Sequence, residues 1–143
     1  MNNQLPSANN QTIPNSQSTN NQTEKRMARG FDLEERTTRF AKAVIRLCKK
    51  LPKNSVNFEL ISQLVRSAGS VGANYREAND ALSKRDFLFR LKITRKEAKE
   101  SHHWLDLVLE ANSGHQLDDE TKQLLGEANE LKKIFSSIIK KSE

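Results

Sequence analysis

The sequence predicts an all-α protein: an antiparallel up-down four-helix bundle that follows a disordered N-terminal tail. Apolar residues recur in alternating steps of three and four along four long segments, which is the spacing of one helix face. The connections between these segments are short, and no segment alternates polar and apolar residues as a strand does. We therefore divide the 143 residues into a tail, residues 1–28, and one bundle domain, residues 29–143.

The tail is predicted from composition. Residues 1–23 consist mainly of Asn, Gln, Ser, Thr and Pro. Such a segment has too little apolar surface to offset the conformational entropy lost on ordering. We expect it to be disordered.

The first two helices are expected over Asp32–Leu51 and Phe58–Ala81. Asp32 has the spacing of an N-cap in a capping box with Glu35, and Pro52 disfavours helical geometry in the residue before it. The residues expected to face inward are Leu33, Thr37, Phe40, Val44, Leu47 and Leu51 on the first helix and Phe58, Ile61, Val65, Ala68, Gly72 and Tyr75 on the second.

The third helix is expected from an N-cap at Ser83 to Ala111, where Gly114 follows as a stop signal, and the fourth begins at an N-cap, Asp118. Their inward residues are expected to be Phe87, Leu91, Thr94, Ala98, Ser101, Leu105 and Val108, and then Leu117, Thr121, Leu124, Ala128, Leu131, Phe135 and Ile138. Further apolar residues lie off these rows and predict contact with another subunit: Leu60, Leu64, Val71, Leu125 and Ile134.

The second helix contains a run of small residues around Gly69 and Gly72. A glycine inside a helix costs about 1 kcal/mol relative to alanine, so the pair requires a reason such as close helix approach. We expect this run to meet the small residues of the third helix, which are Thr94, Ala98 and Ser101.

Polar residues beside that run allow two interpretations. Arg66, Asn74, Arg76 and Glu77 form either helix or subunit contacts, with Arg66 paired to a glutamate such as Glu97, or a ligand or RNA pocket. The first is favoured. Tyr75 and Trp104 are likewise expected to pack rather than to stack on bases.

The third helix carries a local excess of positive charge. Between residues 84 and 99 there are seven Lys and Arg but only two acids, in a chain of formal charge +6. A solvated outer face and a phosphate-binding face both fit this pattern. The candidate nucleic-acid-binding residues are Arg85, Lys92, Arg95, Lys96 and Lys99.

No catalytic or cofactor motif accompanies this charge. Glu100 and His103 have the i, i+3 spacing of a di-iron ligand pair, but Glu127 and Glu130 have no histidine beside them and His115 is expected in a loop. Cys48 is the only cysteine, which excludes an internal disulfide. We expect no enzyme activity, no metal and no cofactor. With no long apolar run and no secretory pattern, a cytoplasmic protein is expected.

Two segments resemble a known family. Gln63-Leu-Val-Arg-Ser-Ala-Gly-Ser-Val-Gly-Ala-Asn-Tyr-Arg-Glu-Ala and Lys96-Glu-Ala-Lys-Glu-Ser-His-His-Trp-Leu are similar to segments of the bacterial 23S ribosomal RNA intervening-sequence proteins, over about residues 31–140. Tyr75-Arg76 departs from the commoner Ile-Ala of that family. The resemblance implies a four-helix bundle, a homopentamer and no established enzymatic activity. The residues that carry it, as a structural motif, are Arg66, Gly69, Ser70, Gly72, Asn74, Glu77, Glu97 and Trp104.

Two functions follow as hypotheses. The first is a non-enzymatic, oligomeric accessory protein that binds RNA or DNA backbones. The alternative is a protein-protein interaction scaffold, such as a reverse-transcriptase accessory subunit. The resemblance supports both, because the accessory proteins of diversity-generating retroelements share the fold and bind nucleic acid and the reverse transcriptase.

Overall fold

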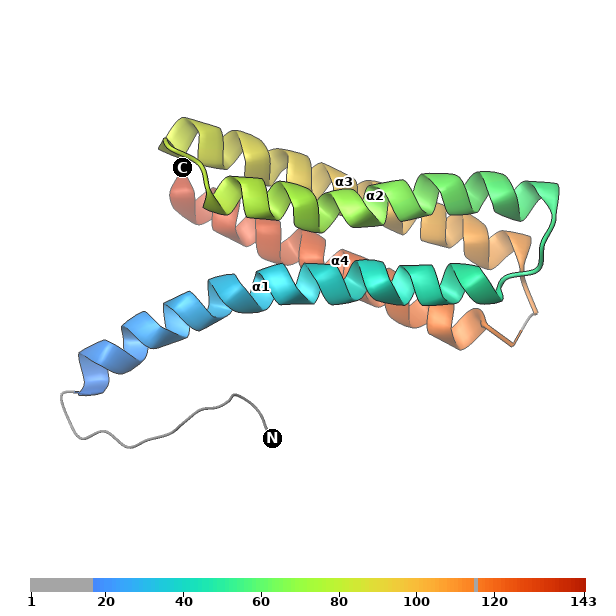
Figure 1. Cartoon of the computed structure of the whole chain (residues 1–143), viewed down its shortest axis with the longest axis horizontal. Coiled ribbons are helices and arrows are strands. Elements are labelled where there is room, and N and C mark those ends of the chain that lie inside the picture. The colour runs from blue at the N-terminus through green and yellow to red at the C-terminus, as the bar shows by residue number, and fades with distance from the viewer. Residues whose placement is uncertain (1–16, 115) are drawn as a thin grey trace. The chain divides into compact units, whose positions relative to one another are not determined.

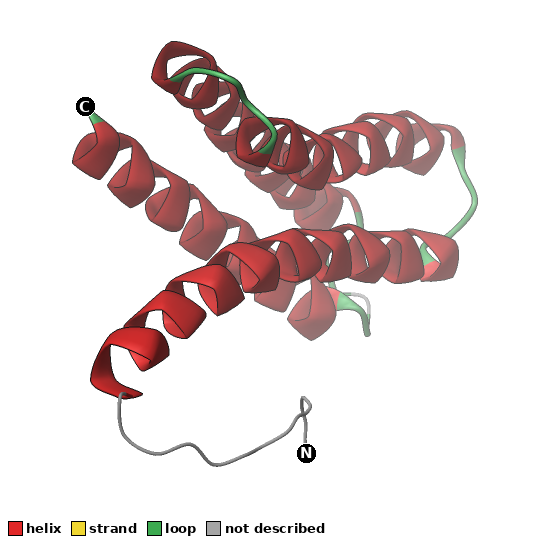
Figure 2. Cartoon of the chain, turned by 60° about the vertical axis from the view of Figure 1, so that its left-hand side comes forward, coloured by secondary structure: helices red, strands yellow, loops and turns green. Residues whose placement is uncertain are grey.

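The computed structural model describes residues 17–114 and 116–143, with side chains from residue 33 onward. These residues form α1 (Gln17–Lys50), α2 (Ser55–Asn79), α3 (Lys84–Ala111) and α4 (Asp118–Ser142) (Figure 1). Loops join them, and the described part of the chain contains no strand (Figure 2). The chain divides into two units, residues 1–33 and residues 34–143, and the bundle is the second unit.

Side-chain hydrogen bonds show that neighbouring helices run antiparallel. Between α2 and α3, Asn57 bonds to Asn112 at 2.9 Å and Ser67 to Ser101 at 3.0 Å, so residue numbers rise on one helix as they fall on the other. The same opposite order relates α1 to α4 and α3 to α4, through the pairs Arg36–Glu127, Lys50–Glu120, Lys92–Glu143 and Arg95–Ser136. The predicted four-helix bundle is confirmed.

The core consists mostly of the predicted rows, with one shift on α2. Phe58 is 57% exposed and Ile61 and Val65 are half-buried, whereas Leu64 and Val71 are fully buried. The prediction for Phe58 was therefore wrong, and Leu64 and Val71 are core residues of the same chain rather than subunit contacts. Two adjacent apolar rows exist on this helix, and periodicity does not decide between them. On α4, similarly, Ile139 is buried and Ile138 only half-buried.

A buried asparagine explains the shift on α2. Asn57 is 1% exposed, and its Nδ2 donates to the Pro52 carbonyl at 2.8 Å and to Asn112 Oδ1 at 2.9 Å. Asn112 Nδ2 donates back to Asn57 Oδ1 at 3.0 Å. Because the two side-chain amides hydrogen-bond to each other, Asn57 can be buried in the core although it is polar. Phe58, the next residue, then lies outside the core.

The starts of α1, α2 and α4 differ from the expected ones. α2 begins at Ser55 rather than at Phe58, after an N-cap, Asn54, whose side chain accepts a hydrogen bond from the Asn57 N–H at 2.8 Å. α1 begins at Gln17, so Asp32 lies within the helix instead of capping it. The good helix formers between residues 24 and 29 favour this extension. At α4 the cap position is Leu117, and Asp118 Oδ2 instead accepts a hydrogen bond from the Gly114 N–H at 3.1 Å. Residues 1–16 of the predicted tail, and the loop position of His115, lie outside the described residues.

Candidate nucleic-acid interface

The start of α3 is fixed by its cap, as predicted. Ser83 Oγ accepts a hydrogen bond from the Asp86 N–H at 3.1 Å, which satisfies one of the free donors of the first turn. From there α3 runs without interruption to Ala111. Its inner side is held by six buried residues: Leu91, Thr94, Ala98, Ser101, Leu105 and Val108.

Because those six residues face the core, most of the predicted Lys and Arg residues lie on the outer side of α3. Arg85, Lys92, Lys96 and Lys99 are exposed, as their helical spacing opposite the core row requires. Arg95 differs: it is half-buried, and its Nη1 lies 3.5 Å from Ser136 Oγ of α4. The structure thus places four of the five residues on one outward row and the fifth at the seam between α3 and α4.

The lysines of α4 extend this charge, which the sequence interpretation missed. The end of α4 contributes Lys132, Lys133, Lys140 and Lys141 against one acid, Glu143, which lies 3.9 Å from Lys92. Lys141 lines a groove together with Lys84 and Phe87, so this end lies beside the start of α3. The sequence already indicated this positive charge, because the acidic residues of α4 lie in its first half and these lysines lie in its second.

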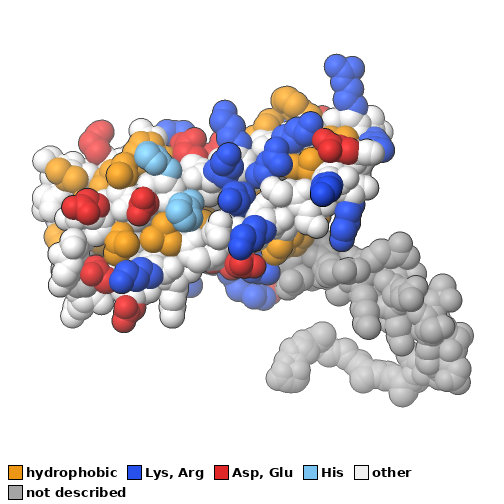
Figure 3. Space-filling view, turned by 180° about the vertical axis from the view of Figure 1, so that it is seen from behind, with side chains coloured by type: hydrophobic (Ala, Val, Ile, Leu, Met, Phe, Trp, Pro, Cys, Tyr) orange, Lys and Arg blue, Asp and Glu red, His pale blue; other side chains and the backbone are white. Residues whose placement is uncertain are grey.

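We call these nine residues the basic surface: Arg85, Lys92, Arg95, Lys96 and Lys99 of α3 and Lys132, Lys133, Lys140 and Lys141 of α4. Figure 3 shows the face from behind, with Lys and Arg gathered over one half of it and most acids over the other half. Residues 84–99 and 132–143 together hold eleven Lys and Arg and three acids, a balance of +8 that exceeds the +6 of the whole chain. The remainder of the chain is therefore net acidic, and the positive charge is local.

An exposed aromatic ring lies within this charge. Phe89 is 57% exposed, and the Arg90 guanidinium lies 5.9 Å from its ring centroid. A shallow groove beside it is lined by Lys84, Arg85, Leu88, Phe89 and Lys92. Tyr75, by contrast, packs as expected: it is buried, with its ring 5.8 Å from that of Phe135. Trp104 is half-buried, and its Nε1 donates a hydrogen bond to Glu100 at 3.2 Å.

The small residues of α2 contact two different helices, α3 and α1. Ser67 meets Ser101 of α3, as predicted, but Gly72 faces α1, where an added Cβ would lie 3.0 Å from Thr37 Oγ1. Gly69 faces open space, with no atom within 4 Å of an added Cβ. The expectation that both glycines meet α3 was therefore wrong. The two glycines are three residues apart, so they point in different directions around the helix axis.

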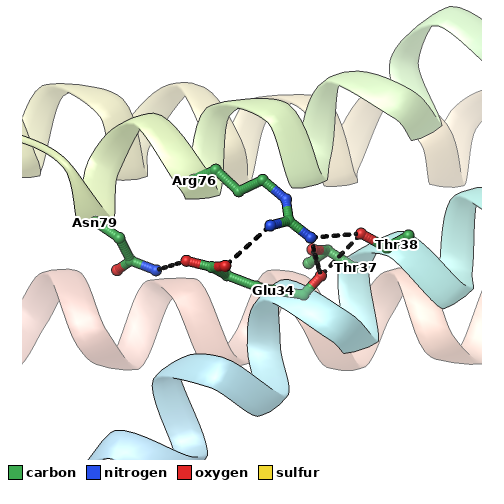
Figure 4. A network of polar contacts seen from close by, with 5 residues as sticks. All are labelled: Glu34, Thr37, Thr38, Arg76 and Asn79. Atoms are coloured by element: carbon green, nitrogen blue, oxygen red, sulfur yellow. Dashed lines mark hydrogen bonds and ion pairs between the residues drawn. The ribbon is translucent and has the colours of Figure 1, made fainter.

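Of the predicted polar residues beside the small-residue run, Arg76 bonds to another helix. Arg76 Nη1 bonds to Glu34 Oε1 at 2.9 Å and its Nη2 to Thr38 Oγ1 at 3.1 Å, while Asn79 donates to Glu34 Oε2 at 2.8 Å (Figure 4). Within α2, Asn74 donates to the Ser70 carbonyl at 2.9 Å. Glu77 is exposed. This network ties α2 to α1, as the favoured interpretation expects, but through Arg76 alone among the four residues.

Arg66 does not form the expected pair with Glu97. Its guanidinium donates to Gln63 of its own helix, and Glu97 Oε1 is buried without a hydrogen-bond partner. Burial raises the pKa of the Glu97 carboxyl, Glu100 raises it further, and Lys96 and Arg66 oppose the rise. The side chains of Arg66 and Glu97 are thus near enough to interact electrostatically but not bonded.

Reactive groups do not gather in the described structure. Burial raises the pKa of the Cys48 thiol to about 11, which opposes formation of the nucleophilic thiolate. Among the side chains that the structure describes, no group of three or more His, Cys, Asp or Glu could hold a metal ion. None of the described helices has both the length and the apolar character needed to cross a membrane.

Comparison with known proteins places this arrangement in a family. The 23S rRNA-intervening sequence protein family matches residues 30–137. A crystal structure of a protein of unknown function from the S23 ribosomal protein family of Bacteroides thetaiotaomicron is 33% identical, with a TM-score of 0.67, over 75% of this chain and 97% of that one. No curated protein matches the chain. The chain therefore belongs to the 23S rRNA-intervening sequence protein family.

Proposed function

We propose that the protein is a non-enzymatic, oligomeric accessory protein that binds the phosphate backbone of RNA or DNA through the basic surface. The observation that carries the proposal is the net charge of residues 84–99 and 132–143, which contain that surface: their balance of +8 exceeds the +6 of the whole chain. Concentrated Lys and Arg on one face attract polyanions and release their counterions on binding. If the same Lys and Arg residues were spread evenly over the protein, they would be explained better as ordinary solvent-exposed residues than as a binding surface.

The form of the surface favours backbone contacts over base recognition. The cations follow the outer side of a helix that is packed in a bundle along its whole inner side. Phosphate contacts position a protein on nucleic acid without reading sequence. Phe89 adds a ring on which an unpaired base could stack, which favours single-stranded or looped segments as ligands.

The first experiment measures binding by fluorescence anisotropy with labelled single-stranded DNA and with a structured RNA hairpin, at salt concentrations from 50 to 200 mM. These are the concentrations over which phosphate contacts lose most of their affinity. Affinity that falls steeply with salt supports the proposal. An absence of binding to both ligands at 50 mM salt contradicts it.

Oligomerisation is supported by apolar side chains that the bundle leaves uncovered. Phe58 is 57% and Ile45 44% exposed, and Val65, seven residues after Phe58 on the same side of α2, is half-buried. Apolar surface of this kind favours a further subunit. The pentamer implied by the sequence resemblance is the expected state, and native mass spectrometry gives the subunit number directly.

A protein-interaction scaffold is the second candidate. Leu82, which is fully exposed, and Phe89 lie near the cations at the start of α3, an arrangement that also suits an acidic protein partner such as a reverse transcriptase. A complex with a protein partner that survives nuclease treatment and 200 mM salt would favour this candidate. A complex lost on nuclease treatment would favour nucleic-acid binding.

A further inference from the structure

A small cleft lies between α3 and α4, next to the basic surface. Its volume is about 170 Å³, and its lining residues are Ala98, Lys99, His102, Ala128, Asn129 and Lys132. Ala98 and Ala128 are fully buried, one on each helix. Because both side chains are only methyl groups, space is left above the point where the two helices meet. A single water needs about 10–15 Å³ of such volume, so the cleft can take a larger group.

The four polar side chains around the cleft are all hydrogen-bond donors. Lys99 and Lys132 each bring an ammonium group, His102 an imidazole N–H and Asn129 an amide N–H₂. No carboxylate lines the cleft. The two lysines that line the cleft carry like charge, and an anion bound between their ammonium groups would offset the repulsion between them.

The nearby acids of α4 are engaged elsewhere. Glu127 bonds to Arg36 of α1 at 2.8 Å, and Glu130 lies 3.8 Å from Lys133. On α3, Glu97 and Glu100 flank Ala98 and Lys99 in the sequence, but neither lines the cleft, and Glu100 accepts a hydrogen bond from Trp104 at 3.2 Å. Asp106, one helical turn beyond His102, is exposed. The donors of the cleft therefore have no carboxylate among its lining residues to neutralise them.

We infer that this cleft is a subsite for one phosphate group, held by Lys99, His102, Asn129 and Lys132. The inference rests on the proposed function for the source of that phosphate, a nucleic-acid backbone that continues from Lys92 and Lys96 across the seam onto α4. Lys92 and Lys99 are seven residues apart on α3, which is about 10 Å along the helix. The subsite thus adds His102 and Asn129 to the ligand contacts and assigns Lys99 and Lys132 of the basic surface to one phosphate.

The subsite predicts a characteristic result for paired substitutions. If Lys99 and Lys132 hold the same phosphate, Lys99→Gln and Lys132→Gln together should lower the salt-dependence slope by about 0.7 to 0.9, the value for one phosphate, rather than twice that. Asn129→Ala should weaken binding roughly three- to tenfold, the effect of one hydrogen bond, with no change of slope. Lys42→Gln and Lys122→Gln together, which change two exposed lysines outside the basic surface, are the control with the same charge change as the pair.

The test that locates the ligand is NMR of the histidine side chains of the full chain. His103 is an internal control, because it neighbours His102 in the chain but its ring lies 4.8 Å from that of Trp104 and it does not line the cleft. Inorganic phosphate, titrated at constant ionic strength, and a short single-stranded oligonucleotide are the two probes. Saturable shifts at His102 that are absent at His103 and lost in Lys132→Gln are expected with both probes.

The outcomes separate this inference from the proposed function. Shifts at His102 with the oligonucleotide alone support a subsite specific for the backbone. Shifts with inorganic phosphate but no oligonucleotide binding keep the subsite, with free phosphate as its ligand, and contradict the proposed function. Oligonucleotide binding by anisotropy that leaves His102 unchanged overturns the subsite and leaves the proposed function intact.

Discussion

Gly72 of α2 lies against Thr37 of α1 so closely that a Cβ at Gly72 would be 3.0 Å from Thr37 Oγ1. That hydroxyl donates to the Glu34 carbonyl at 3.0 Å, which limits how far it can move away. One glycine of the family motif is thus explained by the approach of α1 and α2. The network of Arg76 and Glu34 joins the same two helices one turn further along.

Gly72→Ala should therefore destabilise the protein, although alanine is the better helix former. The expected loss is about 1 to 3 kcal/mol, typical of overpacking, measured by urea unfolding. Gly126→Ala on α4 is the matched control: an added Cβ there meets no atom within 4 Å, so a gain of up to about 1 kcal/mol is expected. Equal gains from both substitutions would contradict the close contact.

The buried amide pair between α2 and α3 should be a strong stabilising feature. Asn57→Ala leaves the Pro52 carbonyl and part of Asn112 without partners, and each unsatisfied buried group costs about 1–3 kcal/mol. We expect a loss of about 2 to 4 kcal/mol. In a double-mutant cycle with Asn112→Ala, the two losses should not add, since the residues share two hydrogen bonds. Additive losses would show that the pair is not formed.

Glu97 should reduce stability at neutral pH. Its pKa is raised in the folded state, so folding favours the protonated carboxyl; the stabilisation is present below the unfolded-state pKa and is lost as pH rises through the folded-state pKa. Glu97→Gln should accordingly raise the free energy of unfolding at pH 7 and leave it nearly unchanged at pH 4 or below. Urea unfolding at both pH values measures this, and a destabilised variant at pH 7 would indicate that Glu97 has a partner in solution.

The exposed apolar side of α2 should control subunit association. Phe58→Glu places a charge on that side, at a residue that is 57% exposed, and should dissociate the oligomer, as sedimentation velocity would show. Leu107→Glu, on an outward position of α3 that is 37% exposed, is the control and should leave the oligomer intact. If Phe58→Glu leaves the sedimentation coefficient unchanged, the interface lies elsewhere.

Features of this structure that depend on local sequence patterns could be predicted, whereas features that depend on contacts between distant residues could not. Helical periodicity and the Ser83 cap were sufficient for the four helices, because both are local patterns. The choice of core row on α2 depended on Asn57 and Asn112, which are far apart in the sequence and meet only in the fold. Arg66 was expected to pair with a glutamate such as Glu97 of another helix, yet it bonds within its own helix.

The candidate site could be predicted only in part, because some of its residues are brought together by contacts between distant segments. The cations of α3 follow from a charge excess along one segment, and the structure exposes four of the five. The lysines of α4 and the cleft above Ala98 and Ala128 depend on which helix ends lie side by side, a relationship between distant segments that periodicity does not give. Phe89 lies off the predicted inward row of α3, so periodicity agrees with its exposure, but no motif in the sequence marks it as a ligand contact.

The most direct test of the central claim compares two triple variants of equal charge in nucleic-acid binding as a function of salt. Arg85→Gln, Lys92→Gln and Lys96→Gln remove three cations from the basic surface, and Lys42→Gln, Lys49→Gln and Lys53→Gln remove three exposed cations elsewhere. Backbone binding at the basic surface predicts that the first variant lowers the log-log salt slope by about 2 to 3, whereas the second leaves it close to that of the unmodified protein. Equal changes in the two variants would contradict the claim, because binding would then follow net charge alone.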